Sequence, residues 1–279
     1  MMIQNICIVP LILALLFAGG CGPKRITEET TSGCVPNDVR VDVNDGTMIV
    51  SFKEDCSAMK SGYNIYISEQ PLVADYSGPS LPATVKPHNH PVFPGDTNPE
   101  DGIEQYEAEG LQNGVVYYVS VRTVLADRSL SKPSLELVTA CGPRGEMELA
   151  IRYSSERDGF SFIRNEFVRA DDLSNDLYFY SRDGQDYLAS PLRLDGFLRD
   201  NKLRLVHNGG ELADISDLIA EGVVSSENRV MVKTGDWVRV QTVEGFTALV
   251  KVLAVEGGDS ERRIRLYYAF SPRTERPLF

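Results

Sequence analysis

The chain is built largely from short segments in which apolar and polar residues alternate, and turn residues separate these segments. D-V-R-V-D-V (38–43) is followed by N-D-G (44–46) and then by T-M-I-V-S-F (47–52). Asp-Gly between two alternating runs is a strong hairpin signal, because glycine readily adopts the positive φ that tight hairpin turns require. Alternation with a period of two also places apolar side chains on one face of a strand. The pattern therefore predicts an all-β fold of antiparallel sheets.

The same pattern covers two stretches, which we interpret as domains over residues 34–140 and 145–279, joined at C-G-P-R-G-E (141–146). Many short strands favour an antiparallel sandwich in the first domain, and the second also has mainly antiparallel strand patterns. The one helical candidate is 211–220. In the second domain we expect strands at 147–153, 159–163, 177–181, 203–207, 228–233, 236–242, 247–255 and 263–270. Acidic stretches are interpreted as solvated turns, with Ca²⁺ loops as the alternative, at 169–176, 183–186 and 257–261.

An apolar run occupies residues 3–20, where Pro10 breaks it and small residues end it. A membrane-spanning helix needs about 20 apolar residues, so a secretory signal segment fits this run better. The four residues Ala18 to Cys21 resemble the lipobox of bacterial lipoproteins. An ordinary signal peptide cut nearby, or a short anchor, is the alternative.

The lipobox resemblance implies cleavage before Cys21 and a diacylglyceryl group on its sulfur. Acyl chains contribute about 0.8 kcal/mol per buried CH₂, so two or three of them hold a protein on a membrane. Gly22 is not the Asp that retains lipoproteins at the inner membrane, so the resemblance favours the outer membrane or cell surface. We therefore expect a signal peptide over 1–20 and a flexible tether over 21–33.

The first domain resembles a fibronectin type III domain, which implies an immunoglobulin-like sandwich. Leu111 followed by Tyr117 matches the tyrosine corner of this family, where the phenol hydroxyl hydrogen-bonds the backbone upstream. Phe52 stands on the second strand, where the family usually has a core Trp. The other residues that carry the resemblance are Val35-Pro36, Gly62 to Tyr66, Leu111 to Val121 and Ser131 to Ser134.

Of the five cysteines, Cys7 is lost with the signal peptide and Cys21 carries lipid. Export permits a disulfide among the other three, and which pair forms depends on the fold. In the fibronectin type III topology, Cys34 and Cys56 lie at the same end of the sandwich and Cys141 at the other. The resemblance therefore implies a Cys34–Cys56 disulfide and an unpaired Cys141.

Seven of the 15 prolines fall within residues 69–102. Proline removes donors from a sheet ladder, so this segment is predicted as an irregular excursion between two strands. Loops on a rigid scaffold concentrate binding, which makes it a candidate binding loop; an insertion without function is the alternative. A metal on two neighbouring histidines would need further ligands such as Asp96, and we predict no metal site. The candidate binding residues are Tyr76, His88, His90 and Phe93.

Residues 232–252 and 264–270 resemble the C-terminal part of HmuY-like lipoproteins, whose named members bind haem. Haem iron takes His, Met, Cys or Tyr as axial ligand. His207 is the only histidine of the second domain and does not align with a ligand pair. We interpret it as an ordinary strand histidine and predict no cofactor.

The net charge of −12 repels phosphate backbones, so we expect no nucleic-acid partner. Nucleophilic catalysis needs a nucleophile, a base and an orienting group, and no motif supplies such a set. The sequence therefore predicts a non-catalytic, lipid-anchored binding or adhesion module. The expected partners are membrane lipid, through Cys21, and an envelope or extracellular protein or glycan. A haem or small-ligand scavenger and an accessory subunit of an envelope enzyme are the alternatives.

Overall fold

The computed structural model describes residues 34–53, 55–72, 81, 84–96, 102–191, 199–209, 218, 227–258 and 260–279. The predicted signal peptide and tether, Tyr76 and nearly all of the helical candidate 211–220 lie outside the described residues. Within these ranges the chain forms antiparallel sheets, as the alternating pattern predicted. No helix that could cross a membrane is found there.

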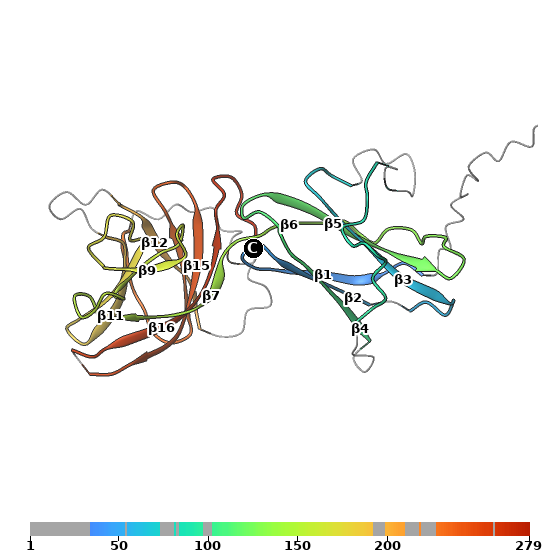
Figure 1. The fold of residues 1–279 in the computed structure, drawn as a ribbon. Helices are drawn as coiled ribbons and strands as arrows, with labels where there is room; N and C mark the ends of the chain where they lie inside the picture. The colour runs from blue at the N-terminus through green and yellow to red at the C-terminus, as the bar shows by residue number, and fades with distance from the viewer. Residues whose placement is uncertain are drawn as a thin grey trace, which may run out of the picture.

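The strands divide into two lobes, which meet near the C-terminal end of the chain (Figure 1). The first lobe contains β1 (Asn37–Val43), β2 (Met48–Lys53), β3 (Lys60–Ser68), β4 (Ile103–Ala108), β5 (Val116–Leu125) and β6 (Leu137–Ala140). The second contains β7 (Arg144–Ala150), β8 (Gly159–Ser161), β9 (Glu166–Val168), β10 (Leu177–Arg182), β11 (Gln185–Ala189), β12 (Lys202–Asn208), β13 (Arg229–Met231), β14 (Asp236–Gln241), β15 (Thr247–Glu256) and β16 (Arg263–Ser271).

The first lobe packs a sheet of order β1-β2-β4 against one of order β3-β5-β6. The Asp-Gly hairpin is confirmed: Val43 pairs with Met48, and the Asn44 amide donates to the Thr47 carbonyl over 2.9 Å. Gly46 has the positive φ of 64° that the turn requires. Phe52 is fully buried and meets the ring of Tyr63 edge-on, with centroids 4.8 Å apart. Burying a side chain of this size contributes about 1.5–3 kcal/mol to stability.

The second lobe packs a sheet of order β13-β11-β10-β8-β9 against one of order β12-β14-β15-β16-β7. Alternate residues of both sheets point into one core, including Leu177 and Phe179 of β10 and Val238 and Val240 of β14. The alternating pattern did not predict the strands β9 and β11. Both are short, and β11 follows β10 through a two-residue Asp-Gly turn, with Arg182 paired to Gln185.

Two of the acidic stretches predicted as solvated turns contain a carboxylate that is bound or buried, so that prediction was wrong for these residues. In 183–186 only the first two residues form a turn, and Asp186 binds Arg262 through two contacts of 2.6 Å. In 169–176 the last residue, Asp176, is completely buried. Composition alone could not separate a solvated carboxylate from one that has a partner elsewhere in the fold.

The joint between the lobes is packed closely. A Cβ added to Gly142 would stand 2.0 Å from the Phe270 carbonyl oxygen, so only glycine fits there. The Phe270 amide donates to the Pro143 carbonyl over 2.8 Å, and Arg273 donates to the Gly114 carbonyl over 2.8 Å. The first bond ties β16 to the linker between the lobes, and the second ties the chain just after β16 to the first lobe.

Candidate functional site

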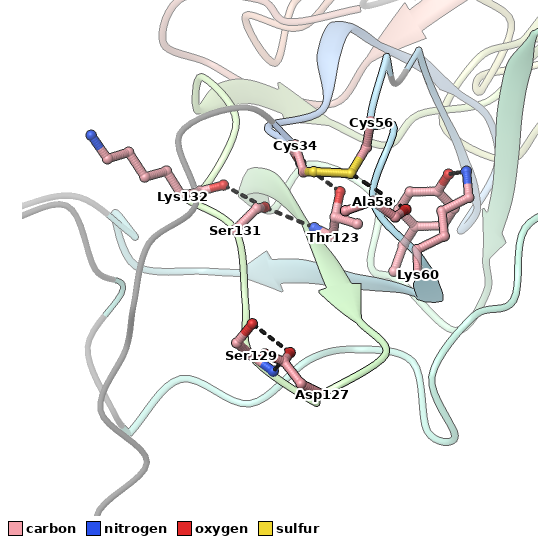
Figure 2. The surroundings of a disulfide bond; sticks show 10 residues. Cys34, Cys56, Ala58, Lys60, Thr123, Asp127, Ser129, Ser131 and Lys132 are labelled. Atoms are coloured by element: carbon pink, nitrogen blue, oxygen red, sulfur yellow. Dashed lines mark hydrogen bonds between the residues drawn. A yellow bond between two sulfur atoms is a disulfide. The ribbon is translucent and has the colours of Figure 1, made fainter.

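A disulfide joins Cys34 to Cys56, with Cα atoms 4.5 Å apart, as the fibronectin type III resemblance implied (Figure 2). It links the chain before β1 to the loop after β2, and the Thr123 hydroxyl donates to the Cys34 carbonyl over 2.7 Å. Cys141 is free and buried, and burial raises the pKa of its thiol to about 11. The thiolate is the reactive form, so Cys141 is chemically inert at neutral pH.

The described end of the predicted binding loop is fixed to β3 by Asn89. Its side-chain oxygen accepts from the Ile65 amide over 2.6 Å, and its nitrogen donates to the carbonyls of Tyr63, over 3.0 Å, and Pro91, over 3.1 Å. Phe93 pairs with Tyr63 as an isolated bridge. Apart from this bridge to the edge strand β3, the described part of the segment is irregular, as its prolines predicted.

Of the predicted binding residues of this loop, His88 and Phe93 both pack against Tyr106, and Tyr76 lies outside the described residues. Phe93 is half-buried and packs against the core, with its ring 5.3 Å from that of Tyr106, so it is not displayed at the loop tip. His88 is exposed, and its Nδ1 lies 2.9 Å from the Tyr106 hydroxyl. Partial burial lowers the pKa of His88 and favours the neutral ring. His90 is exposed.

We expect Asn89→Ala to destabilise the first lobe by about 1–3 kcal/mol, because it leaves buried backbone groups of β3 without partners. In the same variant, hydrogen exchange of the Ile65 amide should be faster than in the parent. His90→Ala is the control, since His90 is exposed and its loss should change stability by less than about 0.5 kcal/mol. Equal effects of the two substitutions would show that Asn89 does not fix the segment.

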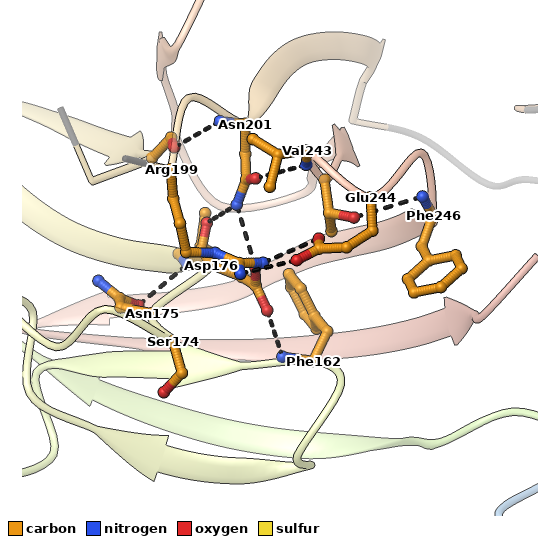
Figure 3. Close-up of polar contacts among 12 residues, drawn as sticks. Phe162, Ser174, Asn175, Asp176, Arg199, Asn201, Val243, Glu244 and Phe246 are labelled. Atoms are coloured by element: carbon orange, nitrogen blue, oxygen red, sulfur yellow. Dashed lines mark hydrogen bonds and ion pairs between the residues drawn. The ribbon is translucent and has the colours of Figure 1, made fainter. Parts of the chain in front are cut away.

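A buried polar cluster connects the two sheets of the second lobe (Figure 3). Asp176, just before β10, accepts from the Phe162 amide over 2.8 Å, from Asn201 over 3.1 Å and from Arg199. Arg199 also binds Glu244, in the β14–β15 turn, at 2.8 Å. Burial raises the pKa of Asp176, and Arg199 opposes that rise. Since Arg199 binds both carboxylates and Asp176 has no exposed surface, the cluster is suited to holding the sheets together.

A group of tyrosines and arginines lies on the outer face of the sheet containing β10. Tyr178 and Tyr180 alternate with core residues Leu177 and Phe179, so both rings leave β10 on the side away from the core. Tyr187 of β11 lies directly opposite Tyr180. We call this group the tyrosine–arginine face, and it consists of Arg152, Tyr153, Tyr178, Tyr180, Tyr187 and Arg229. Tyr178 is only 2% exposed and supports the face from within, where it packs against Tyr180 and the Arg152 guanidinium.

The rings and cations of this face support one another. Tyr180 and Tyr187 are stacked, with centroids 5.0 Å apart and planes at 10°. The Arg152 guanidinium lies 4.3 Å from the ring centre of Tyr153 and 4.7 Å from that of Tyr178, within cation–π range. Arg229 donates to the Tyr180 hydroxyl over 3.3 Å. Within the described part of the chain, neither arginine contacts a carboxylate.

Tyr153 is the most exposed ring of the face, at 68%, and its backbone is unusual. Its φ of 65° is the left-handed conformation, which costs a bulky residue on the order of 1–3 kcal/mol. The buried carboxylate of Asp158 holds it there by accepting from the Tyr153 amide, and Asp158 also accepts from Ala170 over 2.7 Å. The buried Asp158 carboxylate thus holds the Tyr153 backbone in a conformation that leaves the Tyr153 ring exposed to solvent.

A cavity of about 530 Å³ adjoins this corner of the lobe. Ser154 and Ser155, which follow Tyr153 along the chain, line it together with residues of β7 and β16. Its lining also carries arginines and glutamates, among them Arg263 and Glu148, which pair at 3.0 Å. The cavity is therefore polar, with both hydrogen-bond donors and hydrogen-bond acceptors in its lining.

Sequence reasoning missed the tyrosine–arginine face because its members come from separate segments: the loop after β7, β10, β11 and β13. The only local signal is the Tyr-Phe-Tyr run at 178–180, where alternate aromatic residues share a face.

His207 lies on β12 opposite Trp237 of β14, half-buried, and its Nε2 and the indole Nε1 are buried without hydrogen-bond partners. That His207 is an ordinary strand histidine stays a prediction, with haem binding as its alternative. In the described ranges, no group of three or more His, Cys, Asp or Glu side chains is arranged to hold a metal ion.

Neither a scan against protein-family models nor a search of curated proteins finds a match to this chain. The proposals below therefore depend on its own residues and geometry.

Proposed function

We propose that this chain is an extracytoplasmic lipoprotein, held at the outer membrane or cell surface by acyl chains on Cys21, that acts as a non-catalytic binding module. The disulfide between Cys34 and Cys56 is the observation that carries the proposal. Disulfides persist in oxidising compartments, so the cross-link agrees with export by the apolar segment 3–20. The tyrosine–arginine face gives the second lobe a surface suited to a ligand.

We further propose that the first lobe is a fibronectin type III domain. Its sheet orders, β1-β2-β4 and β3-β5-β6, suit that family. In addition, the Gln112 amide donates to the Tyr117 hydroxyl over 2.9 Å, which is the contact expected of a tyrosine corner. Such sandwiches serve widely as scaffolds in surface proteins. As a domain of this type, the first lobe would hold the second lobe away from the membrane and present it to a ligand.

Labelling of cells with radioactive palmitate tests the anchor. We expect the full chain to incorporate the label and Cys21→Ser to lose it completely, because the thioether sulfur is gone. Cys141→Ser is the matched control and should stay labelled, since that thiol is buried in the fold. Label that persists in Cys21→Ser would overturn the proposal.

A further inference from the structure

We infer that the tyrosine–arginine face binds an acidic polysaccharide, a chain of uronic-acid sugars. The inference builds on the proposed binding function and names its ligand class. It depends on the rings, the cations and the fixed geometry of the face.

The rings favour a sugar. Tyrosine combines an apolar ring, which packs against the C–H face of a pyranose, with a hydroxyl that can hydrogen-bond the sugar's own hydroxyls. Tyr180 and Tyr187 are only partly buried, and Tyr153 is largely exposed. Stacking and cation–π contacts hold these rings in place before any ligand arrives. Pre-ordered side chains lose little entropy on binding, which favours a rigid repeating ligand.

The cations favour an acidic sugar. Arg152 and Arg229 contact only tyrosines within the described ranges, whereas other arginines of the lobe, such as Arg169 and Arg262, bind carboxylates. Guanidinium groups bind carboxylates in a bidentate, charge-assisted way. In a chain of net charge −12, two such cations beside aromatic rings form a local site for a carboxylate-bearing ligand.

The cavity lies beside the Tyr153 end of the face, because Ser154 and Ser155, which follow Tyr153 along the chain, line it. The Ser154 hydroxyl donates to the Ile151 carbonyl and can accept from a sugar hydroxyl, whereas the Ser155 hydroxyl accepts from the Arg157 amide and can donate to one. The cavity volume of about 530 Å³ leaves room for a sugar unit. A polymer lying along the face could therefore place one unit near the serines and a carboxylate near Arg152.

The test uses the detergent-solubilised full-length protein and two forms of one polymer, de-esterified polygalacturonate and its neutral methyl ester. Affinity electrophoresis or calorimetry measures binding at low salt. We expect the acidic polymer to bind more tightly than the ester, and binding to weaken as salt is added. Arg229→Glu, at a fully exposed position, should weaken binding of the acidic polymer about ten- to hundredfold without affecting the fold.

Arg164→Glu is the matched control, because it makes the same change of charge at an exposed arginine of the same lobe that pairs with Glu166; it should bind like the parent. Tyr187→Ala should also lose binding, with the melting temperature reporting its folding. Equal binding of both polymers would overturn the acidic ligand class and leave a sugar site. Binding of neither polymer, or binding unaffected by Arg229→Glu, would overturn the inference. Palmitate labelling at Cys21 would still test the proposed function separately.

Discussion

Asp176→Ala is expected to destabilise the second lobe by about 3–5 kcal/mol, the usual cost of removing one partner from a buried ion pair. Asp176 has no exposed side-chain surface, and that of Arg199 is 15% exposed. The substitution leaves the Phe162 amide without its acceptor and Arg199 with Glu244 alone, while Asn201 keeps only the backbone carbonyl of residue 176. Urea unfolding followed by the fluorescence of Trp237, which lies in this lobe, measures the loss.

Two further variants identify the cause. Asp171→Ala removes an exposed carboxylate that pairs with Arg169 at 2.9 Å, and it should cost less than about 1 kcal/mol. Asp176→Asn keeps an acceptor for the Phe162 amide while removing the charge, so its cost should fall between the other two. If Asp176→Ala costs no more than Asp171→Ala, the cluster does not hold the two sheets together.

Replacing both Cys34 and Cys56 by serine is expected to lower the stability of the first lobe by about 3 kcal/mol. The disulfide closes a loop with a sequence separation of 22 residues, and a loop of that length restricts the unfolded chain by roughly this amount in the loop-entropy model. A thiol reductant should destabilise the parent by a similar amount and leave the double variant unchanged. Unfolding in urea with and without reductant measures both effects.

The free cysteine supplies the control for that experiment. Cys141→Ser keeps a donor for the Thr47 carbonyl, which the thiol contacts at 3.3 Å, and it should keep the sensitivity to reductant. A parent whose unfolding is insensitive to reductant, or a reductant effect that disappears in Cys141→Ser, would contradict the Cys34–Cys56 pairing.

Local patterns were enough to predict the all-β class and the Asp-Gly hairpin of the first lobe, and the fibronectin type III resemblance supplied the tyrosine hydroxyl contact. Each depends on residues near one another in sequence: Asp45-Gly46 between two alternating runs, and Tyr117 five residues after the Gln112 amide that it accepts from. The disulfide required more, because the choice between Cys56 and Cys141 followed from a resemblance that supplied the strand order.

The polar cluster and the tyrosine–arginine face could not be predicted, because both depend on which strands become neighbours. Asp176 looked like part of a solvated acidic turn, and its partners lie 23 and 25 residues further on. Arg229 meets Tyr180 across 49 residues of sequence. The second Asp-Gly hairpin was missed for a different reason: four residues of acidic composition masked a strand that begins at Gln185.

Lipid anchoring outside the cytoplasm can be tested by mass spectrometry of the N-terminal peptide from the membrane-extracted protein. We predict that residues 1–20 are absent and that the peptide begins at Cys21, with its mass raised by a diacylglyceryl group on sulfur. A peptide that begins at Met1, or one that contains Cys21 with an unmodified thiol, would contradict the account.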